Sequence, residues 1–184
     1  MRTHGVIPAD NLTDVGGGIY HSGSGEVLLN AAQNEITVAS PRLEMCVVKS
    51  DHPAKMGALS LKSASIPAGI AAASLDEDRS LADTGHVLLI ITTDALNSNQ
   101  RFASPQRLEL LDRGTLPVLL RCGKFEFELE SAMRSPAMYA LDMAGNRTEK
   151  LPVASSGGTL ELSVDMQALK EPAVFFELVD ESNP

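Results

Sequence analysis

Lys124-Phe-Glu-Phe-Glu-Leu-Glu130 is the stretch that decides the fold, because apolar and charged residues alternate along it without a break. Successive side chains of a β-strand point to opposite faces of a sheet, so Phe125, Phe127 and Leu129 would share one face and the charged residues the other. A helix would scatter the three apolar side chains around its circumference. The stretch therefore predicts a strand with one face on a hydrophobic core and one face in water.

Two other stretches extend this pattern. Thr159 to Asp165 also alternates, with Leu160, Leu162 and Val164 on the predicted core face. His86 to Thr93 differs, because the positions from Val87 to Ile91 are all apolar. Such a continuous run is typical of a central strand covered on both faces, so we expect it deep in the fold.

Short apolar runs separated by turn residues continue from Glu26 onward, which is typical of antiparallel strands rather than of βαβ units. Asp142-Met-Ala-Gly145-Asn146 and Ser155-Ser-Gly157-Gly158 suit hairpin turns, so the last strands are predicted to form a meander. No window of ten or more residues has the apolar stripe of a helix. Further strands are expected at Glu26 to Asn30, Glu35 to Ala39, Arg42 to Val48, Ala58 to Lys62, Gly69 to Leu75, Pro117 to Arg121, Ala137 to Asp142, Arg147 to Val153 and Ala173 to Val179.

These patterns predict an all-β fold with little or no helix, an antiparallel β-sandwich of jelly-roll or immunoglobulin-like type. Residues 1–25 are rich in Gly, Asp, Asn and Ser and lack a sustained period, so they predict a loose N-terminal segment. Residues 26–184 are predicted to form a single sandwich domain, because a chain of this length buries roughly 70% of its unfolded surface in one core.

Charge and hydropathy exclude several classes of partner. The 24 acidic and 15 basic side chains give a net charge of −9, and the scattered Lys and Arg form no basic patch, so nucleic-acid binding is not expected. No apolar run approaches the ~18 residues of a membrane span, which predicts a soluble protein. Arg2, Thr3 and His4 follow Met1, so this end lacks the apolar core of a signal peptide. The chain is then either cytoplasmic or a piece of a longer, exported protein.

The two cysteines, Cys46 and Cys122, each lie in an apolar, strand-like run. Such cysteines most often behave as small buried hydrophobic residues, and we favour that interpretation over a disulfide between them. Neither belongs to a CxxC pair or has a histidine nearby, so a metal or redox role is not predicted.

Residues for nucleophilic or acid–base catalysis are not assembled by any motif. The chain has four histidines and no serine in a GxSxG elbow, which argues against a Ser/His/Asp site. Paired carboxylates from distant strands could still cleave a glycoside, but the acidic residues of the alternating strands are expected on the solvent side. The histidines are His4, His21, His52 and His86, and the acidic residues concerned include Glu126, Glu128, Glu161 and Asp165.

A cation site and an aromatic binding site are the remaining candidates. Asp76-Glu77-Asp78 forms the densest acidic cluster, so Asp76 and Asp78 are the candidate ligands for Ca²⁺, although a surface turn is the preferred interpretation because the EF-hand spacing is missing. Trp is absent, and Tyr20 and Phe102 are the rings expected to be exposed for stacking on a sugar. No cofactor is predicted.

The order of the strands resembles the C-terminal β-sandwich domains of large bacterial glycoside hydrolases. The likeness is carried by strand and turn signatures across residues 26–180 and includes no catalytic motif. Its pieces are Glu26-Val-Leu-Leu-Asn30, Ile36-Thr-Val-Ala-Ser-Pro-Arg42, Ala64-Ser-Ile-Pro67, His86-Val-Leu-Leu-Ile-Ile-Thr-Thr-Asp94 with Asn97, Gly114-Thr-Leu-Pro117-Val, Tyr139-Ala-Leu-Asp142 with Gly145 and Arg147, and Phe176-Glu-Leu178.

The resemblance implies a noncatalytic accessory domain that packs against a separate catalytic barrel, which is absent from this sequence. The partner would be a neighbouring catalytic domain or subunit, and an exported parent would place the chain outside the cell or in the periplasm. No catalytic residue is carried over to any position. A carbohydrate-binding module that tethers an enzyme to polysaccharide is the alternative, and a stand-alone hydrolase is a third hypothesis. The glycan, the oligomeric state and the neighbouring domain stay open.

Overall fold

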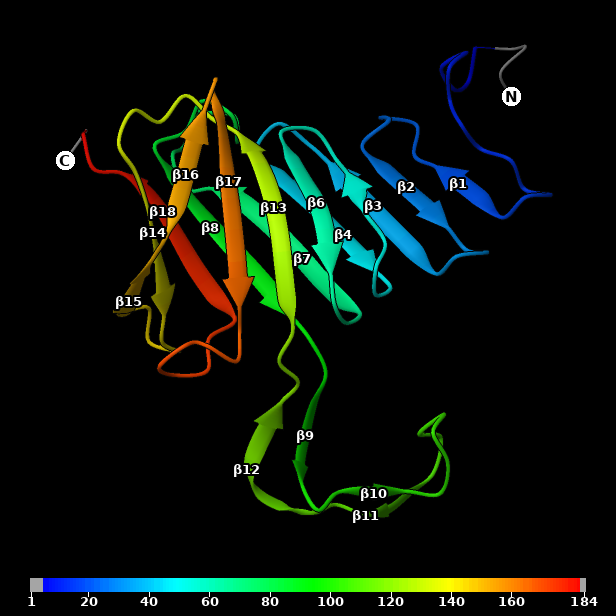
Figure 1. Ribbon diagram of the computed structural model, residues 1–184. Coiled ribbons are helices and arrows are strands. Elements are labelled where there is room, and N and C mark those ends of the chain that lie inside the picture. The colour runs from blue at the N-terminus through cyan, green and yellow to red at the C-terminus, as the bar shows by residue number, and fades with distance from the viewer. Residues whose placement is uncertain (1–4, 183–184) are drawn as a thin grey trace.

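A computed structural model describes residues 5–182, and these residues fold into two large antiparallel sheets that pack face to face (Figure 1). No helix occurs within that range. The prediction of an all-β chain with sandwich architecture is therefore confirmed. His4 lies outside the described residues.

The larger sheet has nine strands and the smaller one has five. The chain passes back and forth between them, and at Pro152 it leaves the larger sheet for the smaller one. In spatial order the larger sheet consists of β1 (Ile19–His21), β2 (Val27–Asn30), β3 (Glu35–Ala39), β4 (Leu43–Val48), β7 (Ala68–Ser74), β8 (His86–Thr92), β18 (Phe175–Asp180), β14 (Pro136–Leu141) and β15 (Arg147–Leu151). The smaller sheet consists of β16 (Val153–Ser156), β17 (Thr159–Asp165), β13 (Lys124–Glu130), β6 (Leu59–Ala64) and β5 (Ala54–Lys55).

Both turns predicted from glycine positions are present. Gly145 lies between β14 and β15 with φ +85°, and Gly157 and Gly158 join β16 to β17 with positive φ. The predicted meander is wrong in one respect, because β15 and β16 belong to different sheets. The chain changes sheet at Pro152, which has no N–H for the ladder.

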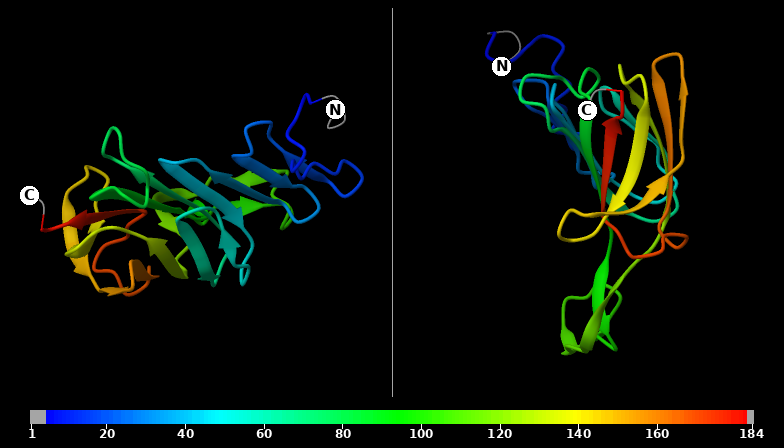
Figure 2. Two further views of the ribbon diagram at one scale, coloured as in Figure 1. Left: turned by 90° about the horizontal axis from the view of Figure 1, so that it is seen from above. Right: turned by 90° about the vertical axis from the view of Figure 1, so that its left-hand side faces the viewer.

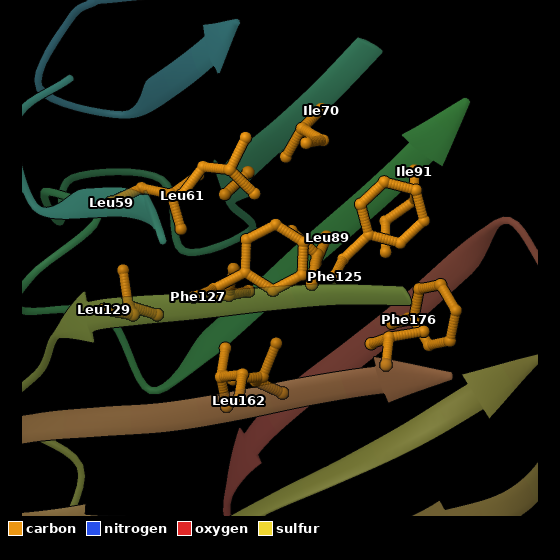
Figure 3. Close-up of a cluster of buried hydrophobic side chains, with 14 of the residues drawn as sticks. Leu59, Leu61, Ile70, Leu89, Ile91, Phe125, Phe127, Leu129, Leu162 and Phe176 are labelled. Carbon is orange, nitrogen blue, oxygen red and sulfur yellow. The ribbon is translucent and has the colours of Figure 1, made fainter. Parts of the chain in front are cut away.

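The alternating strand β13 (Lys124–Glu130) lies in the middle of the smaller sheet and supplies the centre of the core. Phe125, Phe127 and Leu129 are 0–2% exposed. The two phenyl rings stack with centroids 6.3 Å apart, and Figure 3 shows them among Leu89 and Ile91 of β8. Period-two burial therefore determines which face of β13 meets the larger sheet.

The prediction that the run from His86 to Thr93 is covered on both faces is wrong. β8 is central, between β7 and β18, and Val87, Leu89 and Ile91 are buried. Leu88 and Ile90 point to the other side and are only half-buried. The reason is that no further layer of residues 5–182 covers that side of the nine-stranded sheet.

The two sheets differ in width, as the views in Figures 1 and 2 show. The smaller sheet lies over the strands from β4 to β14, whereas β1, β2 and β3 continue the larger sheet beyond it. No residue of these three strands is buried. They are therefore held by ladder hydrogen bonds and same-face contacts rather than by the core.

The outer edge of β1 is covered by residues from the predicted loose segment. Asn11 is 4% exposed, and its Nδ2 donates hydrogen bonds to the carbonyl oxygens of His21 and Ser22 at 3.2 and 2.9 Å. The His21 N–H donates to Thr13 Oγ1 at 3.1 Å. The strand β1 and its cover thus lie within residues 1–25, where the sequence had given no sustained period.

A two-stranded ribbon projects from the sandwich between β8 and β13 (Figures 1 and 2). We call residues 94–121 the arm. It consists of β9 (Ala95–Ser98) paired with β12 (Thr115–Leu120), and of β10 (Arg101–Phe102) paired with β11 (Leu110–Asp112). Its tip folds back, because both Arg107 guanidinium nitrogens donate to the Asp94 carboxylate at 2.8 and 2.6 Å.

One buried carboxylate ties the two sheets together. Glu44 of β4 is 5% exposed and accepts backbone hydrogen bonds from Gly57, Ala58 and Leu59 at 2.9, 2.8 and 2.7 Å. A Cβ on Gly57 would lie 2.5 Å from Glu44 Oε1, so only glycine leaves room for this approach. The carboxylate thereby fixes the start of β6 against the larger sheet.

Glu44→Ala is expected to lower the free energy of unfolding by about 3 kcal/mol, because it leaves three backbone donors without their charged acceptor. Glu44→Gln should fall between the wild type and Glu44→Ala. Urea denaturation monitored by circular dichroism measures the difference. The exposed Glu26 provides the control, since Glu26→Ala should stay within about 0.5 kcal/mol of the wild type. Equal effects of Glu26→Ala and Glu44→Ala would contradict the role of Glu44.

Candidate functional site

The solvent side of the nine-stranded sheet, which we call the outer face, is the main candidate surface. Residues paired directly across antiparallel strands point to the same side of a sheet, so the register defines three rows on this face. The first row is Tyr20, Leu29, Ile36, Val47, Gly69 and Thr92. The second is Val27, Val38, Met45, Ala71, Ile90, Phe175 and Leu141. The third is Leu43, Ala73, Leu88, Glu177, Tyr139 and Lys150.

From β1 to β8 these rows are almost entirely apolar. Tyr20, Leu29, Leu43 and Val47 are 38–44% exposed. Antiparallel sheets with one free face normally carry polar residues there, and monomers rarely expose contiguous apolar patches above a few hundred Å². The second row is apolar and half-buried on six successive strands, from Val27 of β2 to Phe175 of β18, so the outer face departs from this norm.

The opposite end of the outer face is polar. Glu177 Oε1 lies 2.7 Å from His86 Nε2, and Glu177 Oε2 accepts from Arg147 Nε at 2.6 Å. Burial would raise the pKa of Glu177, but the hydrogen bonds from Arg147 and His86 outweigh it and hold that pKa below its usual value. The Arg147 guanidinium also lies 4.3 Å from the centre of the Tyr139 ring. The face thus combines an apolar expanse with a charged border, which is the composition of a protein interface.

The two candidate rings of the sequence analysis are in different parts of the molecule. Tyr20 lies in the first row of the outer face, in β1, and is 44% exposed. Phe102 lies in β10 of the arm, and the Arg107 guanidinium covers its ring at 5.7 Å from the centroid. Figures 1 and 2 show β1 and the arm well apart, so the structure does not bring the two rings together.

Of the candidate cation ligands Asp76 and Asp78, Asp76 stabilises the loop in which it lies. Asp76 Oδ2 accepts hydrogen bonds from Thr84 Oγ1 at 2.7 Å and from the Gly85 N–H at 3.0 Å, and these bonds lower the pKa of Asp76. Asp78 is exposed. Within residues 5–182 no group of three or more Asp, Glu, His or Cys side chains is placed to hold a metal ion. The surface turn is the interpretation that these contacts favour.

A shallow groove on the solvent side of the smaller sheet gathers acidic side chains. Its volume is about 530 Å³, and Glu128 of β13 lies directly opposite Glu161 of β17. Like charges in such cross-strand positions are unfavourable, and Lys62 balances one of them through a 3.0 Å ion pair with Glu128. We call this the acidic groove; it is lined by Lys62, Glu126, Phe127, Glu128, Pro152, Ala154, Glu161, Leu162 and Ser163.

The described histidines contact backbone groups or glutamates rather than a serine or cysteine nucleophile. His21 lies between the Leu12 N–H and the Gly25 carbonyl oxygen, and His52 Nε2 lies 3.3 Å from Glu35 Oε1. His86 contacts Glu177. Within the described part of the chain no histidine is hydrogen-bonded to a serine or cysteine side chain, so no nucleophile and base are joined there.

Both cysteines are free thiols. Cys46 is fully buried in the core, where burial raises the pKa of its thiol to about 11, and Cys122 is half-buried with Sγ 3.6 Å from the Leu120 carbonyl oxygen. The interpretation as a small buried hydrophobic residue is confirmed for Cys46, whereas Cys122 lies at the edge of the core, and the two do not form a disulfide.

The outer face was not predicted, although the apolar run in β8 is a sequence signal for it. The continuous run from Val87 to Ile91 predicts cover on both sides of β8, whereas within residues 5–182 no layer covers the second side. Comparison with protein-family models, curated proteins and solved structures finds no match to this chain. In addition, none of the described residues forms a helix that could cross a membrane.

Val47 and Val48 give a direct test, because these neighbours point to opposite sides of β4 and are 40% and 4% exposed. Val47→Lys should change the free energy of unfolding by no more than about 0.5 kcal/mol. Val48→Lys should cost more than about 4 kcal/mol, since it places a charge in the core. Urea denaturation gives both values, and binding of an apolar dye should fall in Val47→Lys. A large loss of stability in Val47→Lys would show that the outer face is part of the chain's own core.

Proposed function

We propose that this chain is a noncatalytic accessory domain that packs its outer face against a separate protein domain. The observation that supports it best is the second row of that face, which is apolar and only half-buried on six successive strands, from Val27 of β2 to Phe175 of β18, with no covering layer in the described residues. Burying such a row would stabilise a complex by roughly 25 cal/mol per Å² of apolar surface removed from water. The charged border around Glu177 would fix the orientation of the partner.

In the finer form of the proposal the partner is the catalytic barrel of a carbohydrate-active enzyme. Its support is the likeness of residues 26–180 to the C-terminal sandwich domains of glycoside hydrolases. A structural role also suits the acidic side chains that accept backbone hydrogen bonds, because these carboxylates hold loops and strand ends in place. They are Glu44, Asp76, Asp142 and Asp180. The sandwich would then act mechanically, by supporting the barrel.

Side-chain footprinting with hydroxyl radicals tests this proposal on the protein encoded by the full native reading frame. Met45, Leu29 and Tyr20 of the outer face should be oxidised several-fold more slowly in that protein than in the isolated chain. Met143 is the control, because it is 82% exposed in a turn outside the outer face. Unchanged oxidation of all three outer-face residues in a protein that contains a barrel would refute the packing.

A carbohydrate-binding module is the alternative, and the exposed ring of Tyr20 is the feature that favours it. Ring faces provide the apolar platform on which sugars stack. Tyr20 stands among leucine and valine side chains rather than beside a second free ring, so the accessory role is preferred.

Affinity electrophoresis in gels with soluble polysaccharides separates the two functions. For an accessory domain we expect the mobility of the wild type and of Tyr20→Ala to be the same in every gel. Retardation of the wild type in one glycan, lost in Tyr20→Ala and kept in Phe102→Ala, would instead establish sugar binding at the outer face.

A further inference from the structure

The arm exposes large apolar side chains along its whole length. Leu108 and Leu116 are 91% and 81% exposed, and Leu110, Leu111, Val118 and Leu119 are 45–58% exposed. Large apolar side chains gathered on one exposed element of a protein mark a site of contact with another molecule.

No layer of residues 5–182 covers the ribbon on either side. Val118 and Leu119 are neighbours in β12 and therefore point to opposite faces, yet both are more than half exposed. An isolated two-stranded ribbon is marginally stable in water. Both faces of the arm are therefore suited to burial against another surface.

The charge of the arm indicates the kind of surface against which it would pack. The arm contains four Arg and three acidic residues, a net charge of +1, which leaves 11 basic and 21 acidic residues, a net charge of −10, on the rest of the chain. Four of the nine Arg lie in the arm and none of the six Lys. Arg is enriched and Lys depleted at protein interfaces. The Arg113 guanidinium, next to the exposed Leu111 and Leu116, has no ion pair or hydrogen bond within residues 5–182.

The acidic groove on the smaller sheet has the complementary character. Within residues 5–182 Lys62 forms the one ion pair of Glu126, Glu128 and Glu161, and the exposed Pro152 and Ala154 give the groove its apolar wall. An arginine inserted beside Glu161 would relieve the like-charge pair between β13 and β17. Leucines of the arm could contact the apolar wall at the same time.

We infer that the arm docks into the acidic groove of a second copy of this chain, with Arg113 beside Glu161. The partner surface is thus the same protein, joined by a head-to-tail contact that generates a ring or an open chain of copies. This contact uses neither the outer face nor the neighbour assigned to it under the proposed function, so either conclusion can fail without the other.

Sedimentation velocity over a range of protein concentrations tests this inference by charge exchange. Wild type should self-associate, and added salt should weaken the association. Arg113→Glu and Glu161→Arg should each weaken it about tenfold or more, and the double variant should recover it. Arg134→Glu and Glu77→Arg, at exposed positions outside the arm and the groove, should behave like the wild type. Val47→Lys on the outer face should also associate normally.

Recovery in the double variant guards against misfolding, since a misfolded single variant would not be rescued by the second change. A wild type that stays monomeric at all concentrations overturns the inference. Association that survives Arg113→Glu removes the arm from the contact, and association that survives Glu161→Arg removes the groove. If Arg134→Glu weakened self-association as much as Arg113→Glu, the change in net charge alone would explain the effect, and the inference would be refuted.

Discussion

The packing of β13 against the larger sheet is the interaction on which the rest of the structure depends. Phe125, Phe127 and Leu129 supply the centre of the only large core in the described residues, and every strand of the smaller sheet is positioned by its register to β13 or to a neighbour of β13. Because this sheet has five strands and its partner nine, the core cannot extend under β1 to β3. The unequal widths leave one side of the molecule without its own cover.

The polar groups follow from the same arrangement. Carboxylates that point into or around the sandwich satisfy backbone donors at places where a strand begins or a loop closes, as Glu44 does for β6 and Asp180 does for Arg134 and Ser135. Hydrogen bonds of this kind hold the pKa of Asp180 far below its usual range. These carboxylates therefore have a structural role. The two surfaces described above are the apolar outer face and the acidic groove.

Much of the fold could be predicted from the sequence, because the alternation of apolar and polar residues in β13 and β17 is visible within each strand, whatever strands lie beside it. The strands β1, β5, β9, β10, β11 and β16 were not predicted, because each is only two to four residues long, too short for a period of two to be recognised. The outer face could not be identified for a different reason. A row such as Val38, Met45, Ala71 and Ile90 draws one residue from each strand, and its continuity exists only once the register is known. The likeness to glycoside hydrolase sandwich domains stays a prediction.

The cover over β1 has a consequence for how copies of this protein can meet. A free strand at the rim of a sheet is a template for hydrogen bonding to another chain, and this is the route by which sheets grow into fibrils. At this rim the carbonyl and N–H of His21 already have partners in Asn11 and Thr13. These hydrogen bonds block the addition of a further strand at the β1 edge. The sheet can therefore expose apolar residues on its outer face without polymerising through that edge.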